Sequence, residues 1–234
     1  MQLIGVLINH IYRSMFLTGD QGLKNTDSIL KIIFVFSTIY SFILFKEYLT
    51  IYLLTLFIIL GLIDKGVKWF YSVSILSLIP STWYSLVAYI FSITGISEYV
   101  SLIRILWIFI RTYTFTYMII FYVSIINPLN IYNLLLKIKL SRYSIIPVMT
   151  WRIIPYSLNN MIDSLAIGQL KKEKTTQRLA PAIASMIETG ELVKESSYYK
   201  IYTKPQIEIP IKKSIKHNLI LIITTITTIT LTLI

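Results

Sequence analysis

Few residues of this chain are of the types that carry out catalysis or bind metal ions. Its 234 residues include no cysteine and two histidines, His10 and His217, which stand far apart in the sequence. The lack of cysteine excludes disulfides, thiolate metal sites and thiol nucleophiles, and two distant histidines give no basis for a metal or catalytic cluster. The acids outside residues 127–216 stand near expected loops, without the paired spacing of acid–base catalysis: Asp20, Asp27, Glu47, Asp64 and Glu98. We therefore expect a non-catalytic chain with no metal and no cofactor.

The segment 61–68 mimics a phosphate-binding loop through Gly61 and Gly66. Val67 occupies the position at which such a loop requires lysine, and the preceding residues form a long apolar run. We therefore reject a nucleotide site here and expect that the chain does not hydrolyse ATP itself.

The composition is that of an integral membrane protein. Apolar side chains make up 55% of the residues and charged side chains 14%, whereas soluble domains average about 25% charged residues. Several apolar runs approach or exceed the roughly 20 residues that cross a bilayer as a helix: about 28–45, 48–63, 69–97, 100–126 and 217–234. The expected fold class is all-α, a polytopic membrane protein with about five transmembrane helices.

Two of these runs need an argument beyond their length. The run 69–97 contains Pro80, which favours one long kinked or tilted helix over two separate spans. The run 217–234 is rich in Ile and Thr, which favour strands in water. A lone strand in lipid would leave its backbone groups unpaired, so we expect a helix there as well. Lys31, near the start of the first run, can snorkel to the headgroups.

Basic residues indicate how the chain is oriented. Residues 127–216 hold 14 of the 22 Lys and Arg residues and 6 of the 11 acids, so they carry +8 of the net charge of +11. In a membrane protein such a segment marks the cytoplasmic side more often than a nucleic acid site, and we expect no nucleic acid partner. The expected protein is a multi-pass protein of the cell membrane with its C-terminus outside.

The expected organisation has four parts. Residues 1–26 form an N-terminal interfacial segment, 27–126 a membrane domain with four spans, 127–216 a cytoplasmic domain of amphipathic coupling helices, and 217–234 a C-terminal transmembrane helix. Residues 1–17 are apolar but lack the basic start and the cleavage site of a signal peptide. For them we prefer a helix lying against the membrane to a sixth span.

The cytoplasmic domain contains amphipathic helical patterns. Pro128 fits the first turn of a short helix over 129–140. Two longer patterns follow at intervals of three and four residues, one through Ile154, Leu158, Met161 and Leu165, the other through Leu179, Ile183, Met186, Gly190 and Val193. Gly190 costs helix stability but allows two helices to approach closely. On periodicity alone, packing on each other or on the membrane surface explains these helices as well as any further role does.

Motifs in the same segment resemble a known family. Asn-Pro-Leu at 127–129, Arg-Ile-Ile-Pro from Arg152 to Pro155 and Ala-Pro-Ala-Ile around Pro181 follow one another. Their order and spacing resemble the transmembrane T component of energy-coupling factor (ECF) transporters, a scaffold subunit similar to that of cobalt and nickel uptake systems. In that family an Arg-Phe-Ile-Pro stretch opens the second coupling helix, and each long coupling helix ends in Ala-Arg-Gly.

The resemblance implies a role in energy coupling. In the family, the arginine of each Ala-Arg-Gly signature docks in an acidic groove of an ATP-binding cassette subunit. Lys171 and Lys200 stand at these positions here, and they keep the charge but not the planar fork of arginine. The implied partners are two ATP-binding cassette ATPase subunits and a substrate-binding membrane S component, with a vitamin or a transition-metal ion as the solute. The residues implied in coupling-helix packing are Arg152, Pro155, Pro181 and Gly190.

Other interpretations stay open. Lys171 and Lys200 would complement helix macrodipoles as C-terminal cations without any partner. Arg111 lies well inside the fourth expected span, which makes it a candidate contact with a partner membrane subunit or with an internal acid. Arg104 is expected to reach the interface instead. The alternative function is a stand-alone polytopic carrier, channel or membrane scaffold without an ATPase partner.

Overall fold

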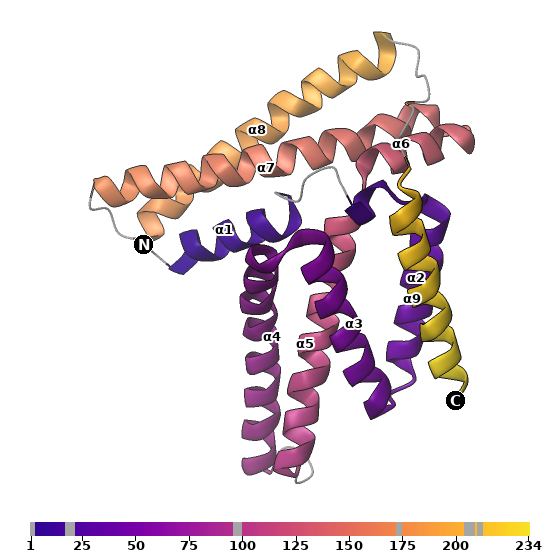
Figure 1. Cartoon of the computed structure of the whole chain (residues 1–234). Coiled ribbons are helices and arrows are strands. Elements are labelled where there is room, and N and C mark those ends of the chain that lie inside the picture. Colours follow the sequence, from indigo (N-terminus) through magenta and orange to yellow (C-terminus); the bar gives the residue numbers. More distant parts are fainter. Residues whose placement is uncertain (1–2, 17–21, 96–99, 172–174, 204–208, 210–212) are drawn as a thin grey trace. The chain divides into compact units, whose positions relative to one another are not determined.

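The computed structural model describes residues 3–16, 22–95, 100–171, 175–203, 209 and 213–234, and the regular elements in these residues are all helices (Figure 1). In chain order they are α1 (Leu3–Met15), η1 (Gly22–Asn25), α2 (Ser28–Ile43), α3 (Glu47–Lys65), α4 (Val67–Ile93), α5 (Leu102–Ile125), α6 (Pro128–Lys137), α7 (Ser141–Leu170), α8 (Thr175–Thr203) and α9 (Ile215–Leu233). The all-α fold class predicted from the sequence is confirmed.

The helices fall into two compact units. One contains Arg13–Ile125 and Lys213–Ile234 and is called the membrane unit below; the other contains Met1–Tyr12 and Ile126–Lys212 and is called the α7–α8 unit. The last helix therefore groups with the earlier apolar helices. The start of α1 groups with the segment after α5, whereas the sequence analysis assigned it to a separate N-terminal segment.

Four helices are long and apolar enough to cross a membrane: α3 and α9 with 19 residues each, α4 with 27 and α5 with 24. α2 is also apolar but has 16 residues. At about 1.5 Å per residue it reaches about 24 Å, against a hydrocarbon core of about 30 Å. The five spans expected from the sequence are therefore four helices of full length and one shorter helix.

The apolar runs 69–97 and 217–234 correspond to the helices α4 and α9, as predicted from the sequence. α4 continues through Pro80 without a break. In α9 the threonine hydroxyls donate to carbonyls of the preceding turn, such as Thr228 to Thr224 at 2.7 Å, which satisfies them inside an apolar helix. Thr228 is fully buried and also lies 3.3 Å from the hydroxyl of Tyr52 in α3.

The core of the membrane unit is aromatic. Phe57 of α3 lies edge-on to Phe121 of α5 with ring centroids 5.2 Å apart, and Trp69 of α4 lies edge-on to Tyr117 of α5 at 5.8 Å. The indole N–H of Trp69 donates to the carbonyl oxygen of Ser14 at 2.7 Å. Such ring pairs contribute about 0.5–1.5 kcal/mol beyond the area they bury. Together they define how α3, α4 and α5 pack.

Gly61 of α3 allows the indole of Trp69 to lie against the α3 backbone. A Cβ atom at Gly61 would come within 2.3 Å of Cζ3 of Trp69 and 3.1 Å of the hydroxyl oxygen of Tyr117. We expect Gly61→Ala to lower the free energy of unfolding by about 1–3 kcal/mol, as in other overpacked cores, and to lower the thermal midpoint measured in detergent. The control is Gly190→Ala in α8, where a Cβ atom would meet no described heavy atom within 4 Å. That variant should be neutral or slightly stabilising, and equal midpoints for both would contradict the packing of Trp69 on Gly61.

The α7–α8 unit contains α6, α7, α8 and the start of α1. The side chain of Asn127 accepts a hydrogen bond from the Leu129 N–H at 3.0 Å and so caps α6, with Pro128 in its first turn as predicted. The side-chain amide of Asn160 in α7 donates to the hydroxyl of Thr189 in α8 at 3.1 Å. The first contact caps α6, and the second is a hydrogen bond between α7 and α8.

The apolar seam predicted for α7 packs on α1. Ile8 and Leu165 are 7% and 6% exposed, and Leu158 and Met161 pack against them. In α8, by contrast, Ile183 of the predicted seam is 50% exposed. The partner of the α7 seam is therefore the start of α1, a segment that the sequence analysis expected to lie against the membrane.

Candidate functional site

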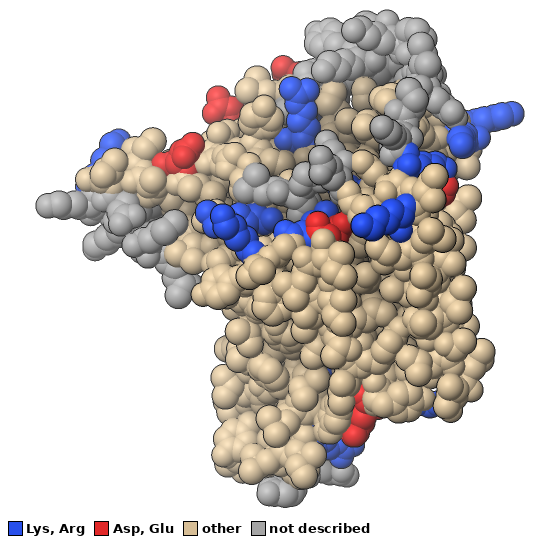
Figure 2. Space-filling model, viewed as in Figure 1, with Lys and Arg blue, Asp and Glu red and all other residues tan. Residues whose placement is uncertain are grey.

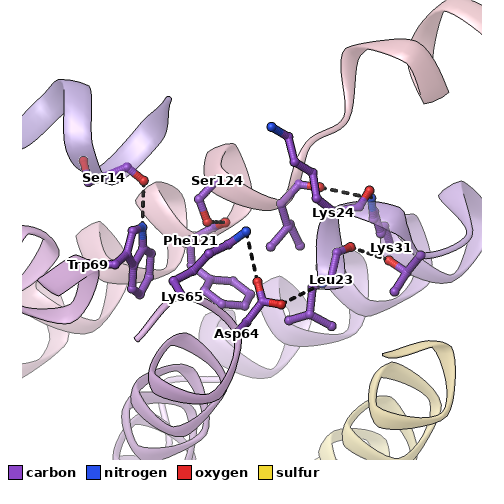
Figure 3. Close-up of polar contacts among 11 residues, drawn as sticks. Ser14, Leu23, Lys24, Lys31, Asp64, Lys65, Trp69, Phe121 and Ser124 are labelled. Carbon is purple, nitrogen blue, oxygen red and sulfur yellow. Dashed lines mark hydrogen bonds and ion pairs between the residues drawn. The ribbon is translucent and has the colours of Figure 1, made fainter. Parts of the chain in front are cut away.

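A cluster of buried polar groups joins helix ends in the membrane unit, and we call Leu23, Lys24, Lys31, Asp64 and Lys65 the polar junction (Figure 3). The carboxylate of Asp64 accepts a hydrogen bond from the Leu23 backbone N–H at 2.7 Å and pairs with the Lys65 ammonium at 3.0 Å. The side chains of Asp64 and Lys65 are 1% and 4% exposed. Because buried charges are tolerated only when paired, these contacts hold η1 against the C-terminal end of α3.

Two glycines shape the polar junction. Gly66, with φ 81°, ends α3 directly after Lys65. Gly22 has φ 74°, and a Cβ atom there would lie 2.0 Å from Oδ1 of Asp64. Glycine at position 22 therefore provides both the left-handed backbone and the space that the carboxylate needs to reach Leu23.

Lys31 points into the membrane unit. Its ammonium donates to the carbonyl oxygens of Lys24 at 2.7 Å and Ile125 at 3.0 Å, and the residue is buried. Ile125 is the last residue of α5, so the ammonium satisfies a carbonyl that the helix leaves unpaired, at the negative end of the helix dipole. The expectation that Lys31 snorkels to the headgroups is therefore wrong.

The start of α9 is attached at the same end of the membrane unit. The carboxylate of Asp27 pairs with the ammonium of Lys213, and its backbone N–H donates to the side-chain oxygen of Asn218 at 3.0 Å. The Ser214 N–H donates to the carbonyl oxygen of Asn25 at 3.1 Å. Asp27 also caps the N-terminus of α2. These bonds attach the first turn of α9 to the start of α2. Asp27 and Asn218 are 191 positions apart in the sequence.

The polar junction connects helix ends through charged side chains and backbone groups. Lys31 lies in the field of two further lysines, Lys24 and Lys65, as well as of Asp64 and Asp27. Asp64 therefore offsets the repulsion that Lys31 experiences from these lysines, besides pairing with Lys65. In the described part of the chain, no group of three or more His, Cys, Asp or Glu residues is placed to hold a metal ion.

These contacts were not predicted from the sequence, in which Asp27 and Asp64 were expected to stand near loops. A signal was present at the end of the second apolar run. Asp64 and Lys65 are adjacent opposite charges followed by Gly66, a common helix stop, and they pointed to a charged helix end. No signal indicated that Leu23 or Ile125 would supply the partner groups.

Charge is distributed unevenly between the two ends of the membrane unit. Among the described residues, the end with the polar junction carries the acids Asp27 and Asp64 and the cations Arg13, Lys24, Lys31, Lys65, Lys68, Lys213 and Lys216. The opposite end carries Lys46, Glu47 and Arg104. On the face shown in Figure 2, the surface of this unit between its ends is mostly without charged side chains, as expected for contact with lipid.

Arg111 of α5 contacts the end of α2. Its Nη2 donates to the carbonyl oxygen of Phe42 at 3.1 Å, and its guanidinium carbon lies 4.9 Å and 3.2 Å from the ring centroids of Phe42 and Phe45. Arg111 therefore contacts a backbone carbonyl of its own chain. Among the described residues no acid pairs with Arg111. Arg104 is exposed.

The two candidate docking lysines lie in the α7–α8 unit. Lys171 directly follows α7, where its N–H bonds to the Ile167 carbonyl at 3.1 Å, and it is exposed. Lys200 lies in the last turn of α8, and its side chain is outside the described residues. α8 begins four residues after Lys171, and from its first residue, Thr175, to Lys200 it measures about 38 Å at 1.5 Å per residue. Lys171 therefore precedes α8 in the chain, and Lys200 lies near the far end of that helix.

The residues implied in coupling-helix packing are spread along the same helices. Arg152 is exposed, and Pro155 lies inside α7, which begins at Ser141, whereas the family pattern places the proline at a helix start. Pro181 is exposed inside α8. A long helix accommodates an internal proline at the cost of one backbone hydrogen bond, so these prolines do not mark helix ends. A Cβ atom at Gly190 would meet no described heavy atom within 4 Å, so a close helix crossing at Gly190 stays a prediction.

Comparisons of the chain with known family models, with curated proteins and with solved structures gave no match. The function is therefore inferred from the chain's own helices and side chains and from the resemblance of its motifs.

Proposed function

We propose that the chain is the transmembrane scaffold subunit of an importer of the energy-coupling factor type, located in the cell membrane as a multi-pass protein. It transmits motion from ATP-binding cassette ATPases to a substrate-binding membrane subunit that takes up a vitamin or a transition-metal ion. The observation that carries this proposal is a pair of helices of 30 and 29 residues, α7 and α8, placed in the chain between the apolar helices α5 and α9. A rigid helix pair joined at both ends to membrane helices can pass on a rigid-body motion.

The positions of two cations support a pair of ATPase contacts. Lys171 is exposed directly after α7, and Lys200 lies in the last turn of α8. The length of α8 from Thr175 to Lys200, about 38 Å, leaves room for two separate soluble subunits. In this proposal α7 and α8 are the coupling helices, and Lys171 and Lys200 are the docking cations.

The orientation proposed for the chain follows from its charge. The polar junction end carries most of the cations of the membrane unit, so by the positive-inside rule it faces the cytoplasm. Single cysteines introduced into this cysteine-free chain allow a direct check with an impermeant thiol reagent in intact cells. We expect labelling at position 46 from outside and none at position 172. Labelling of position 172 from outside would overturn the orientation.

Copurification tests the function itself. The full chain is extracted from its native membrane in mild detergent, and the proteins that remain bound are identified. We expect ATP-binding cassette ATPase subunits and one further membrane protein, whose ligand would identify the solute class. A chain that is recovered alone under conditions that preserve its fold would instead favour a stand-alone carrier, channel or membrane scaffold.

A further inference from the structure

The helices of the membrane unit end at different levels on the side away from the polar junction. α2 and α5 run antiparallel, since Lys31 bonds to Ile125 at one end and Arg111 contacts Phe42 at the other. From Arg111 to its first residue, Leu102, α5 continues for about 14 Å at 1.5 Å per residue. Figure 1 shows α4 and α5 extending past the turn that joins α2 to α3. Arg111 therefore marks the level at which α2 ends and the α4–α5 hairpin continues.

Apart from the exposed Arg104 near its end, the extension of this hairpin is mostly apolar. Its exposed side chains include Trp83, Leu86, Ile90, Leu102, Ile103 and Leu106, each more than half exposed. An apolar surface of this kind requires hydrocarbon or protein around it. With lipid around the hairpin, the bilayer extends beyond the level of Arg111, and the charged turn residues Lys46 and Glu47 lie below the headgroups of an unperturbed leaflet.

The guanidinium of Arg111 is held in place with most of its donors open. It has five N–H donors, of which one bonds to the Phe42 carbonyl, and no other acceptor is found among the described residues. The ring of Phe45 lies over the guanidinium. Phe45 is 72% exposed, and its backbone is left-handed with φ 59°. A left-handed conformation is strained for a bulky residue and is found where function or packing requires it.

We propose that Arg111 binds the phosphate group of a membrane phospholipid, which is drawn into the leaflet beside the α2–α3 turn. The planar fork of arginine matches two phosphate oxygens, and these would occupy the donors left open by the Phe42 carbonyl. The apolar hairpin next to Arg111 provides a surface for the acyl chains, which a dissolved anion does not need. The length of α2 agrees independently, because bilayers accommodate a helix of about 24 Å by local thinning. This site goes beyond the transport role proposed above and requires no ATPase partner.

Lipid retention by the purified full chain tests the site. The chain is equilibrated in detergent with phosphatidylglycerol, and bound lipid is counted by native mass spectrometry. We expect Arg111→Gln to weaken retention roughly tenfold, as for the loss of a charge-assisted hydrogen bond. Arg104→Gln is the matched control, because Arg104 is an exposed arginine seven residues away on the same helix and, among the described residues, lacks the carbonyl and ring contacts that hold Arg111. Its loss of retention should be clearly smaller. Inorganic phosphate added in excess should not displace the lipid.

A second variant keeps the test valid if Arg111→Gln fails to fold. Phe45→Gly relieves the left-handed backbone at Phe45 and so should fold at least as well as the parent chain. It removes the ring over the guanidinium, and we expect retention to fall by about two- to fivefold. Equal retention by the Arg111→Gln and Arg104→Gln chains, or unchanged retention by Phe45→Gly, would overturn the proposal. Displacement by inorganic phosphate would also overturn it and identify a site for soluble anions.

Discussion

Asp64→Ala is expected to lower the free energy of unfolding by about 3–5 kcal/mol, the cost of removing one partner of a buried ion pair. The substitution leaves the Lys65 ammonium without its carboxylate and the Leu23 N–H without its acceptor, both inside the membrane unit. It also removes one of the two acids that favour the charged form of Lys31. Unfolding by denaturing detergent in mixed micelles measures the loss.

Three further variants separate charge from packing. Asp64→Asn keeps an acceptor for Leu23 but not the charge, so its stability should lie between those of the parent chain and the alanine variant. Combining it with Lys65→Met removes both charges and should recover most of the loss, because no unpaired charge is left buried while the asparagine oxygen can still accept from the Leu23 N–H. Asp27→Asn disrupts a pair whose Lys213 side chain is 59% exposed and should cost about 1 kcal/mol or less. Equal losses for Asp64→Ala and Asp27→Asn would show that the polar junction is not a main support of the fold.

Lys171→Glu is expected to abolish ATPase association and uptake together, on the proposal that Lys171 docks in an acidic groove. The lysine is exposed directly after α7, so its reversal need not disturb the fold. At a protein interface close charge pairs couple by about 1.5–7 kcal/mol, and reversal replaces that attraction by repulsion. Copurification of ATPase subunits and solute uptake by cells provide the two measurements.

The controls for this prediction use the other lysines of the same segment. Lys200→Glu should behave like Lys171→Glu, and Lys→Arg at either position should be tolerated because it restores the residue found in the resembled family. Lys174→Glu, in the polar segment between the two helices, should have a smaller effect. If both glutamate variants retain parental ATPase association with unchanged membrane insertion, these lysines are helix-end or headgroup cations and the docking assignment is wrong.

Helix type and membrane character were determined by the sequence alone. The long apolar runs became α3, α4, α5 and α9 with ends a few residues from those expected. The reason is local, because a segment without water must satisfy its backbone groups within itself, and a helix does so whatever its neighbours are. The same reasoning predicted a helix at the Ile- and Thr-rich end of the chain and the continuation of α4 through Pro80.

The pairing of helix ends was decided only by the tertiary structure. The position of Lys31 near the start of an apolar run fits both a snorkelling cation and a buried one, and the carbonyls of Lys24 and Ile125 decide for the buried one. Arg111 was expected to meet an acid or a partner, yet the carbonyl of Phe42 lies within its reach. The apolar pattern of a membrane helix is nearly the same on every face, so it does not specify a neighbour. The hydrophobicity of a segment and the pairing of its backbone N–H and C=O groups in a helix are determined by that segment alone. The bonds of Lys31, Asp64 and Arg111 depend on which distant helix ends meet.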